Sequence, residues 1–191
     1  MPFPLDSFTR TMVEHHFRRK KLEWTEDYFL QALDSHSKHD VYWAVLALRD
    51  CGTARSVPAL RAKLGHPMQD VKCTAILTIA HIAGANETLL FGEALLSAPY
   101  KEKGYAMWAI RDAADARAVE PVLTYFQKNR AKLRRGALVN GTLPDGVQYL
   151  NRYATFQPAI RSFFDEVRSA WERLAAGERE EIIKRVPTFM G

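Results

Sequence analysis

The chain has 191 residues, of which 47% are hydrophobic and 26% are charged, a composition typical of a folded domain and not of a disordered chain. It contains no run of 18 apolar residues and no secretory leader, so the sequence predicts no membrane span and a cytoplasmic location. The two cysteines, Cys51 and Cys73, lie in apolar stretches, which is typical of small buried residues in a reducing compartment.

Positive charge is concentrated in one part of the chain. The net charge is +5, yet the segment from Lys128 to Arg161 contains seven cationic side chains and one acidic side chain, Asp145. A local positive field attracts acidic partners. We therefore expect this region to meet either an acidic protein surface or a nucleic acid.

Two amphipathic helices are predicted before residue 40. Asp6 or Ser7 can cap the first helix, and Thr25 can cap the second. The apolar face of the first helix is predicted to comprise Phe8, Met12, Val13 and Phe17. Because this pair resembles the later pairs in layout but not in sequence, residues 1–39 are expected to cap a stack of repeats.

The centre of the chain carries a repeated helix pair. The segment 47–57 (ALRDCGTARSV) returns 62 residues later as 109–119 (AIRDAADARAV), and a weaker copy lies between them at 71–96. In the first copy, Asp40 is expected to cap the start of a helix and Gly52 its end. A helix pair that recurs about every 31 residues is typical of an α-solenoid.

The last third of the chain departs from this repeat. A fourth unit is predicted to start at Ala131, followed by a helix over 147–156 and a strongly amphipathic helix after Pro158. No strand is predicted. We therefore expect one all-α, right-handed solenoid domain over residues 1–191, with these parts: cap helices over 1–39, three repeats over 40–128, and an irregular unit with C-terminal helices over 129–191.

Three units resemble the short HEAT-like repeats of phycobilisome-lyase-type proteins: residues 40–64, 70–96 and 103–128. The resemblance rests on the Asp-Val helix starts at Asp40 and Asp70, the helix ends at Gly52 and Gly84, and the Val-Pro-x-Leu sequence from Val57. It implies stacked antiparallel helix pairs and a docking surface, not a particular activity. It also implies that the helices lining the concave face start near Val41, Val71, Lys103 and Ala131.

Two groups of residues are candidates for partner binding. The candidates on the inner helices are Trp43, Arg49, Asp50, Trp108, Arg111 and Asp112. Their Arg-Asp pairs either grip a partner or hold neighbouring repeats in register, and their tryptophans either anchor a partner or pack between repeats. The basic candidates, which either contact an acidic partner or form a solvated face, are Lys128, Arg130, Lys132, Arg134 and Arg135.

No catalytic motif and no phosphate-binding glycine loop is recognisable. His36 and His39 share a connector with Asp34 and Asp40, but their spacing matches no metal-binding motif, so a polar loop is expected. The sequence therefore predicts no metal, no cofactor and no catalytic residue, and it favours a non-enzymatic role.

These features favour a protein–protein interaction module, either an adaptor or a dedicated inhibitor such as an immunity protein. The expected partner is a protein with an acidic surface, bound by the concave face and the basic C-terminal region. Two alternatives remain open. A nucleic-acid-binding protein, similar to the HEAT-like DNA glycosylases, would need a basic groove that is continuous across the inner helices. A lyase-type chaperone for a bound cofactor would need an apolar pocket of ligand size.

Overall fold

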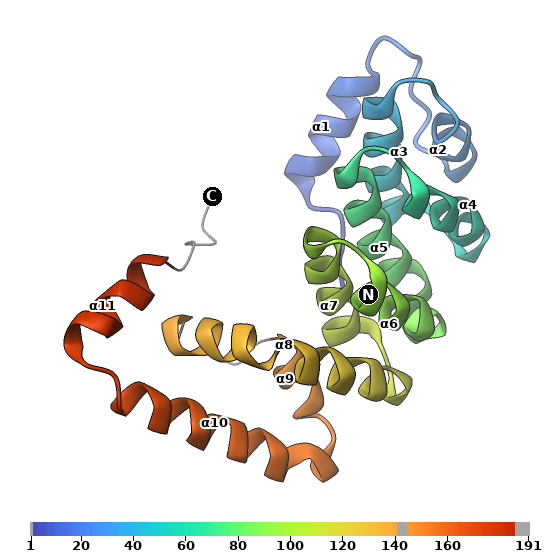
Figure 1. Ribbon diagram of the computed structural model, residues 1–191. Coiled ribbons are helices and arrows are strands. Elements are labelled where there is room, and N and C mark those ends of the chain that lie inside the picture. Colours follow the sequence, from blue (N-terminus) through green and yellow to red (C-terminus); the bar gives the residue numbers. More distant parts are fainter. Residues whose placement is uncertain (1, 141–144, 186–191) are drawn as a thin grey trace. The chain divides into compact units, whose positions relative to one another are not determined.

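The computed structural model describes residues 2–140 and 145–185 (Figure 1). Within these ranges the regular elements are helices and no strand is present, which confirms the all-α prediction. The fourth unit, which the sequence predicts to run from Ala131 to Leu143, ends outside the described residues. The chain divides into two compact units, 1–121 and 122–191, and each is described by itself. The extent of a single domain over the whole chain stays a prediction.

The first unit is built from two layers of helices. Helices α1, α3, α5 and α7 lie side by side in one layer, and α2, α4 and α6 form the other (Figure 1). The α-helices are α1 (Ser7–Phe17), α2 (Glu26–Ala32), α3 (Lys38–Cys51), α4 (Val57–Ala62), α5 (Gln69–Ala83), α6 (Thr88–Ser97) and α7 (Tyr100–Ala113). The 3-10 turns between them are η1 (Ala54–Ser56), η2 (Lys63–Gly65), η3 (Gly84–Glu87) and η4 (Ala116–Ala118).

The caps of the two N-terminal helices are as predicted, but the apolar face of α1 is only partly so. Asp6 accepts a hydrogen bond from the backbone N of Thr9 at 2.8 Å, and Thr25 caps α2. Val13 and Phe17 are buried, whereas Phe8 is 74% exposed. The reason is the helical period: nine residues separate Phe8 from Phe17, so the two side chains point to opposite sides of α1.

The prediction that Asp40 caps α3 is wrong. The helix begins at Lys38, and Ser37 is the cap, accepting from the backbone N of Asp40 at 3.4 Å. The Asp40 carboxylate is instead buried, and it accepts a hydrogen bond from Lys20 in the turn after α1 and one from Ser35 at 2.8 Å. Burial by itself raises the pKa of Asp40, but these bonds, with His16 at 2.7 Å, outweigh it and lower the pKa to about 2.

The repeated sequence is reflected in the packing. Ala47 and Leu48 of α3 are fully buried, and so are their equivalents Ala109 and Ile110 of α7. At the end of α3, Gly52 donates its backbone N–H to Leu48 O at 2.9 Å. A Cβ atom on Gly52 would lie 2.4 Å from that oxygen, so the close approach explains why glycine ends this helix.

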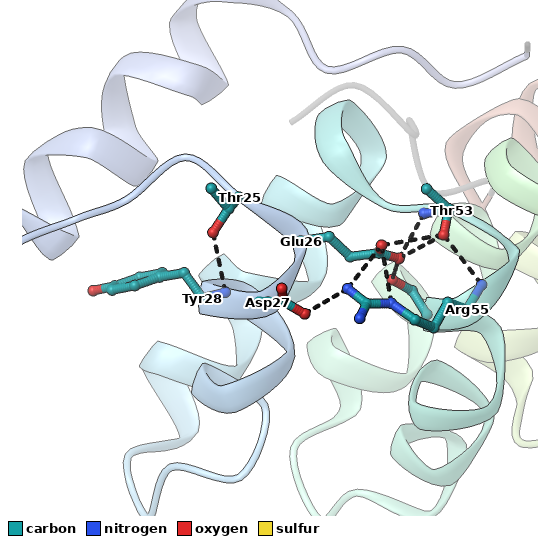
Figure 2. Close-up of polar contacts among 7 residues, drawn as sticks. Thr25, Glu26, Asp27, Tyr28, Thr53 and Arg55 are labelled. Atoms are coloured by element: carbon teal, nitrogen blue, oxygen red, sulfur yellow. Dashed lines mark hydrogen bonds and ion pairs between the residues drawn. The ribbon is translucent and has the colours of Figure 1, made fainter.

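The turn after each of these two helices is bonded to the preceding helix of the other layer. Figure 2 shows the first joint, in which Glu26 of α2 accepts from the backbone N of Thr53 at 2.8 Å and from the side chains of Arg55 and Ser56. In the second joint, the backbone N of Asp115 donates to Thr88 Oγ1 of α6 at 3.2 Å. The repeat therefore fixes an inter-helix contact as well as a helix pattern.

The second unit is also helical. Helix α8 (Val119–Asn140) runs into it from the first unit, and the remaining elements are α9 (Asp145–Leu150), η5 (Ala154–Phe156), α10 (Gln157–Glu172) and α11 (Ala176–Arg185). Helix α8 leaves helical geometry at Asn129, close to the predicted boundary between the third and fourth units. The helix expected over 147–156 is divided into α9 and η5. Phe163 and Val167 of α10 pack with Ala137 in a small apolar core.

Candidate partner-binding surface

The last turn of α3 places Arg49 against α5. Its Nε donates to Thr78 Oγ1 at 3.1 Å, and the same hydroxyl donates to the carbonyl of Val45 at 3.1 Å. Thr78 is fully buried and Arg49 is half-buried. The guanidinium is therefore held in a fixed place between α3 and α5, which Figure 1 shows side by side in the layer of α1, α3, α5 and α7. The sequence predicts this layer to be the inner one.

Arg49 has no carboxylate partner among the described residues. Burial lowers the pKa of its guanidinium, while the nearby Tyr42, Tyr105 and Asp6 act in the opposite direction. Removing a cation from water costs desolvation free energy. A hydrogen bond to a neutral hydroxyl offsets only part of this cost, so a half-buried cation with only a hydroxyl partner is further stabilised by a nearby anion. Arg49 can therefore gain from binding an anion.

The Arg-Asp pair of the first repeat is divided between two contacts. Asp50 accepts from Arg10 Nη1 at 2.6 Å and from Trp24 Nε1 at 2.6 Å, so it faces the N-terminal helices and not Arg49. In the third repeat, Arg111 instead holds Asp112, with Nε–Oδ1 at 2.8 Å and Nη2–Oδ2 at 2.7 Å. The same dipeptide therefore gives two different arrangements, and the Arg-to-Asp ladder between repeats that the sequence suggested as one alternative stays a prediction.

The two tryptophans also differ. Trp108 of α7 is 40% exposed, and its ring lies 5.0 Å from that of Tyr105. Trp43 of α3 is half-buried, with ring centroids 6.0 Å from His16 of α1 and 5.1 Å from Tyr42. Trp43 thus takes part in packing against the N-terminal helix, whereas Trp108 leaves a large aromatic surface open to solvent. A binding role of either stays a prediction.

The basic stretch lies in the second unit and is partly neutralised. Glu166 of α10 forms ion pairs with Arg130 and, at 3.2 Å, with Arg134 of α8. The side chains of the other three basic candidates are exposed: Lys128, Lys132 and Arg135. The count of charged residues from Lys128 to Arg161 did not include Glu166, which follows this segment in the chain. Glu166 contacts Arg130 and Arg134 because α10 packs on α8.

The structure also shows polar contacts in the layer of α1, α3, α5 and α7 that the sequence did not predict. Asp70 forms an ion pair with Lys101 at 2.6 Å, one repeat length away. His81 is only 7% exposed, and its Nδ1 has no hydrogen-bond partner in the described parts of the chain. Burial lowers the pKa of His81, and the charge of Arg49 lowers it further. The repeat period was the signal that could have found the Asp70–Lys101 pair.

A cleft opens between α5, α6 and α7, with a volume of about 280 Å³. Its lining includes Ile76, Leu90 and the half-buried Lys72, which lies 3.6 Å from the buried Glu102. The volume is at the lower limit of ligand pockets, which run from about 300 to 1,000 Å³. Residues 2–140 and 145–185 contain no group of three or more His, Cys, Asp or Glu side chains placed to hold a metal ion.

One described segment, residues 69–97, has the length and composition of a membrane span. It consists of α5, η3 and α6, and 61% of its 18-residue apolar window is buried within the protein. Gly84, with φ of +54°, ends α5 in this segment. Packing in the core of the protein explains why this segment is apolar. The segment is therefore only weak evidence for a membrane span.

Comparison with known proteins gives one match. The family model of the PBS lyase HEAT-like repeat matches residues 40–66, which the structure folds as α3, η1, α4 and η2. No curated protein and no solved structure matches the chain. The resemblance that the Asp-Val start, the helix-ending glycine and the Val-Pro-x-Leu sequence indicated is therefore confirmed for this segment, and residues 40–66 are a HEAT-like repeat of the PBS lyase type.

Proposed function

We propose that this chain is a non-catalytic protein-interaction module of the cytoplasm, acting as an adaptor or as a dedicated inhibitor. HEAT-like repeats generally serve protein interaction, and one such repeat is present. We further propose that the helix pairs stack as a right-handed solenoid, with α1 and α2 as its N-terminal cap. The two layers of the first unit support this arrangement (Figure 1).

The exposure of Trp108 is the observation that carries the proposal. A tryptophan that is 40% exposed beside Tyr105 offers a large aromatic surface, and such residues are enriched among the anchors of protein interfaces. The neighbouring Arg111–Asp112 pair adds polar groups at the same helix. In the second unit, Lys128, Lys132 and Arg135 would add attraction for an acidic partner.

The charges of the inner layer favour a protein over a nucleic acid. Lys101 is paired with Asp70, and Arg111 is paired with Asp112. A basic groove that is continuous across α3, α5 and α7 would need these cations to be free for phosphates. The cleft of about 280 Å³ likewise gives little support to a cofactor chaperone, because the charged Lys72 and Glu102 are part of its lining.

The test is capture of partners from the native cell by the tagged full chain, with and without nuclease. Trp108→Ala is compared with Phe8→Ala, which removes an aromatic side chain that is 74% exposed on α1. We expect a stoichiometric protein that survives nuclease, is lost with Trp108→Ala and is retained with Phe8→Ala. Recovery of nucleic acid alone, or equal loss with both variants, contradicts the proposal.

A further inference from the structure

We propose that Arg49 is a carboxylate-binding residue, which takes up an aspartate or glutamate side chain of the partner protein between Tyr42 and Tyr105. This inference rests on the proposed function, because it names the chemistry by which the inner layer recognises its partner. The proposed carboxylate site lies at Arg49 in the first repeat and is separate from the aromatic surface at Trp108 in the third repeat.

The guanidinium of Arg49 is positioned for this role. Its Nε is engaged by Thr78 Oγ1 at 3.1 Å, and Thr78 is fixed in turn by the carbonyl of Val45. The two terminal nitrogens form no hydrogen bond with the described residues, and neither is a fully buried unsatisfied atom. A planar guanidinium with an oriented stem and open terminal donors is suited to bind both oxygens of a carboxylate.

The third repeat shows such a contact inside this chain. Arg111 occupies the position equivalent to Arg49, and it binds both oxygens of Asp112, at 2.8 and 2.7 Å. Arg49 lacks this internal partner because Asp50 is bonded to Arg10 and Trp24. Within residues 2–140 and 145–185, one of two equivalent arginines is therefore without a carboxylate, and a partner would supply that group.

The small number of unpaired cations near Arg49 favours a carboxylate on a protein over a phosphate polymer. Asp6 contributes a negative charge near Arg49, and Asp70 contributes one near Tyr42. Burial lowers the pKa of His81, and the charge of Arg49 lowers it further, which disfavours a second positive charge beside Arg49. The nearby Lys101 is paired with Asp70. A single guanidinium can bind one carboxylate, whereas a nucleic-acid backbone needs several cations along its length.

The test uses the ¹⁵N-labelled full chain and follows the arginine Nε–Hε resonances by NMR. The probe is a tetraglutamate peptide with both ends blocked, and the comparison ligands are blocked tetraglutamine and a short oligothymidylate. We expect tetraglutamate, but not tetraglutamine, to shift the resonance that disappears in Arg49→Lys. The inference is overturned if tetraglutamate shifts the resonances of every arginine except Arg49. It is also overturned if oligothymidylate binds at Arg49 more tightly than tetraglutamate does.

Three variants separate a specific contact from general attraction. Arg49→Gln should weaken tetraglutamate binding about tenfold, since charge-assisted hydrogen bonds are among the strongest polar contacts. Arg49→Lys keeps the charge and the packing of the stem, and it should bind more weakly than the unmodified protein because it lacks the planar fork. Arg19→Gln removes one charge from an exposed position and should bind as the unmodified protein does. Equal weakening by Arg49→Gln and Arg19→Gln overturns the inference.

Partner capture then distinguishes the two proposals. If Trp108→Ala loses the partner while Arg49→Gln and Arg49→Lys both retain it, the interaction module stands and the carboxylate site is wrong. If tetraglutamate binds at Arg49 but Trp108→Ala retains the partner, the carboxylate site stands and the aromatic surface is wrong. Thermal unfolding of each variant shows that a lost interaction is not a lost fold.

Discussion

Glu26 of α2 accepts a hydrogen bond from the backbone N of Thr53 at 2.8 Å, across 27 residues of chain. The same carboxylate accepts bonds from the side chains of Ser56 and Arg55 (Figure 2). It therefore bonds the N-terminal helix pair to the turn that follows α3. Thr88 occupies the corresponding place in the later joint, where it accepts from the backbone N of Asp115. The joint is thus a repeated feature of the first unit that tolerates different side chains.

We expect Glu26→Gln to lower the free energy of unfolding by about 2 kcal/mol, because it weakens several charge-assisted bonds at a largely buried carboxylate. Urea denaturation followed by circular dichroism measures the change. Asp27→Asn is the matched control, since Asp27 also contacts Arg55 but is 71% exposed, and it should change stability by less than about 0.5 kcal/mol. Equal effects of the two substitutions would show that the joint does not depend on Glu26.

Acid should destabilise the protein through Glu26 and Asp40. Burial by itself raises the pKa of Glu26, but hydrogen bonds from Ser56, Thr53 and Arg55 lower it from 4.5 to about 2, and the pKa of Asp40 is lowered from 3.8 to about 2. A carboxyl with a lower pKa in the folded state stabilises the fold above its unfolded pKa and loses this effect as the pH falls through the folded value. Unfolding free energy should therefore fall from about pH 5 to pH 2.

The variant Glu26→Gln tests this assignment, because its amide does not titrate. Its stability should fall less than that of the unmodified protein between pH 5 and pH 2, as measured by urea denaturation at each pH. Parallel stability curves for the two proteins would mean that other carboxyl groups account for the acid sensitivity.

Arg134→Glu and Arg135→Glu should differ, although the residues are neighbours in the sequence. Arg134 is half-buried and pairs with Glu166, so Arg134→Glu replaces an attraction by a repulsion and should destabilise the chain by about 1 kcal/mol. Arg135 is exposed, and its reversal should stay within about 0.5 kcal/mol. Thermal denaturation of both variants makes the comparison, and an equal loss would contradict the ion pair between α8 and α10.

Two glycines should respond to alanine in opposite directions. In Gly52→Ala the new Cβ would lie 2.4 Å from Leu48 O and 2.9 Å from Ile82 Cδ1, so we expect a loss of about 2 kcal/mol. In Gly104→Ala, within α7, the Cβ meets nothing within 4 Å, and the higher helix propensity of alanine should add about 0.5–1 kcal/mol. Chemical denaturation measures both changes, and destabilisation by Gly104→Ala would show that α7 does not pack as described.

The sequence by itself determined the local structure. Capping residues such as Asp6 and Thr25, the helix-ending Gly52 and Gly84, and the repeated Arg-Asp segment located most of the helices and the HEAT-like repeat, because helix ends depend on residues that are close in the chain. A predicted helix boundary was wrong where two capping residues lie close together. In α3 the cap is Ser37 and not Asp40.

Only the tertiary structure decided what the candidate residues contact. Arg49 and Arg111 stand in the same dipeptide, yet Arg49 bonds to Thr78 of the next helix while Arg111 holds its own neighbour. The difference arises because Asp50 is taken by Arg10, 40 residues away, and by Trp24, 26 residues away. Partners at such separations are set by how the helices pack, and a local pattern in the sequence carries no information about which of several cations a carboxylate will meet.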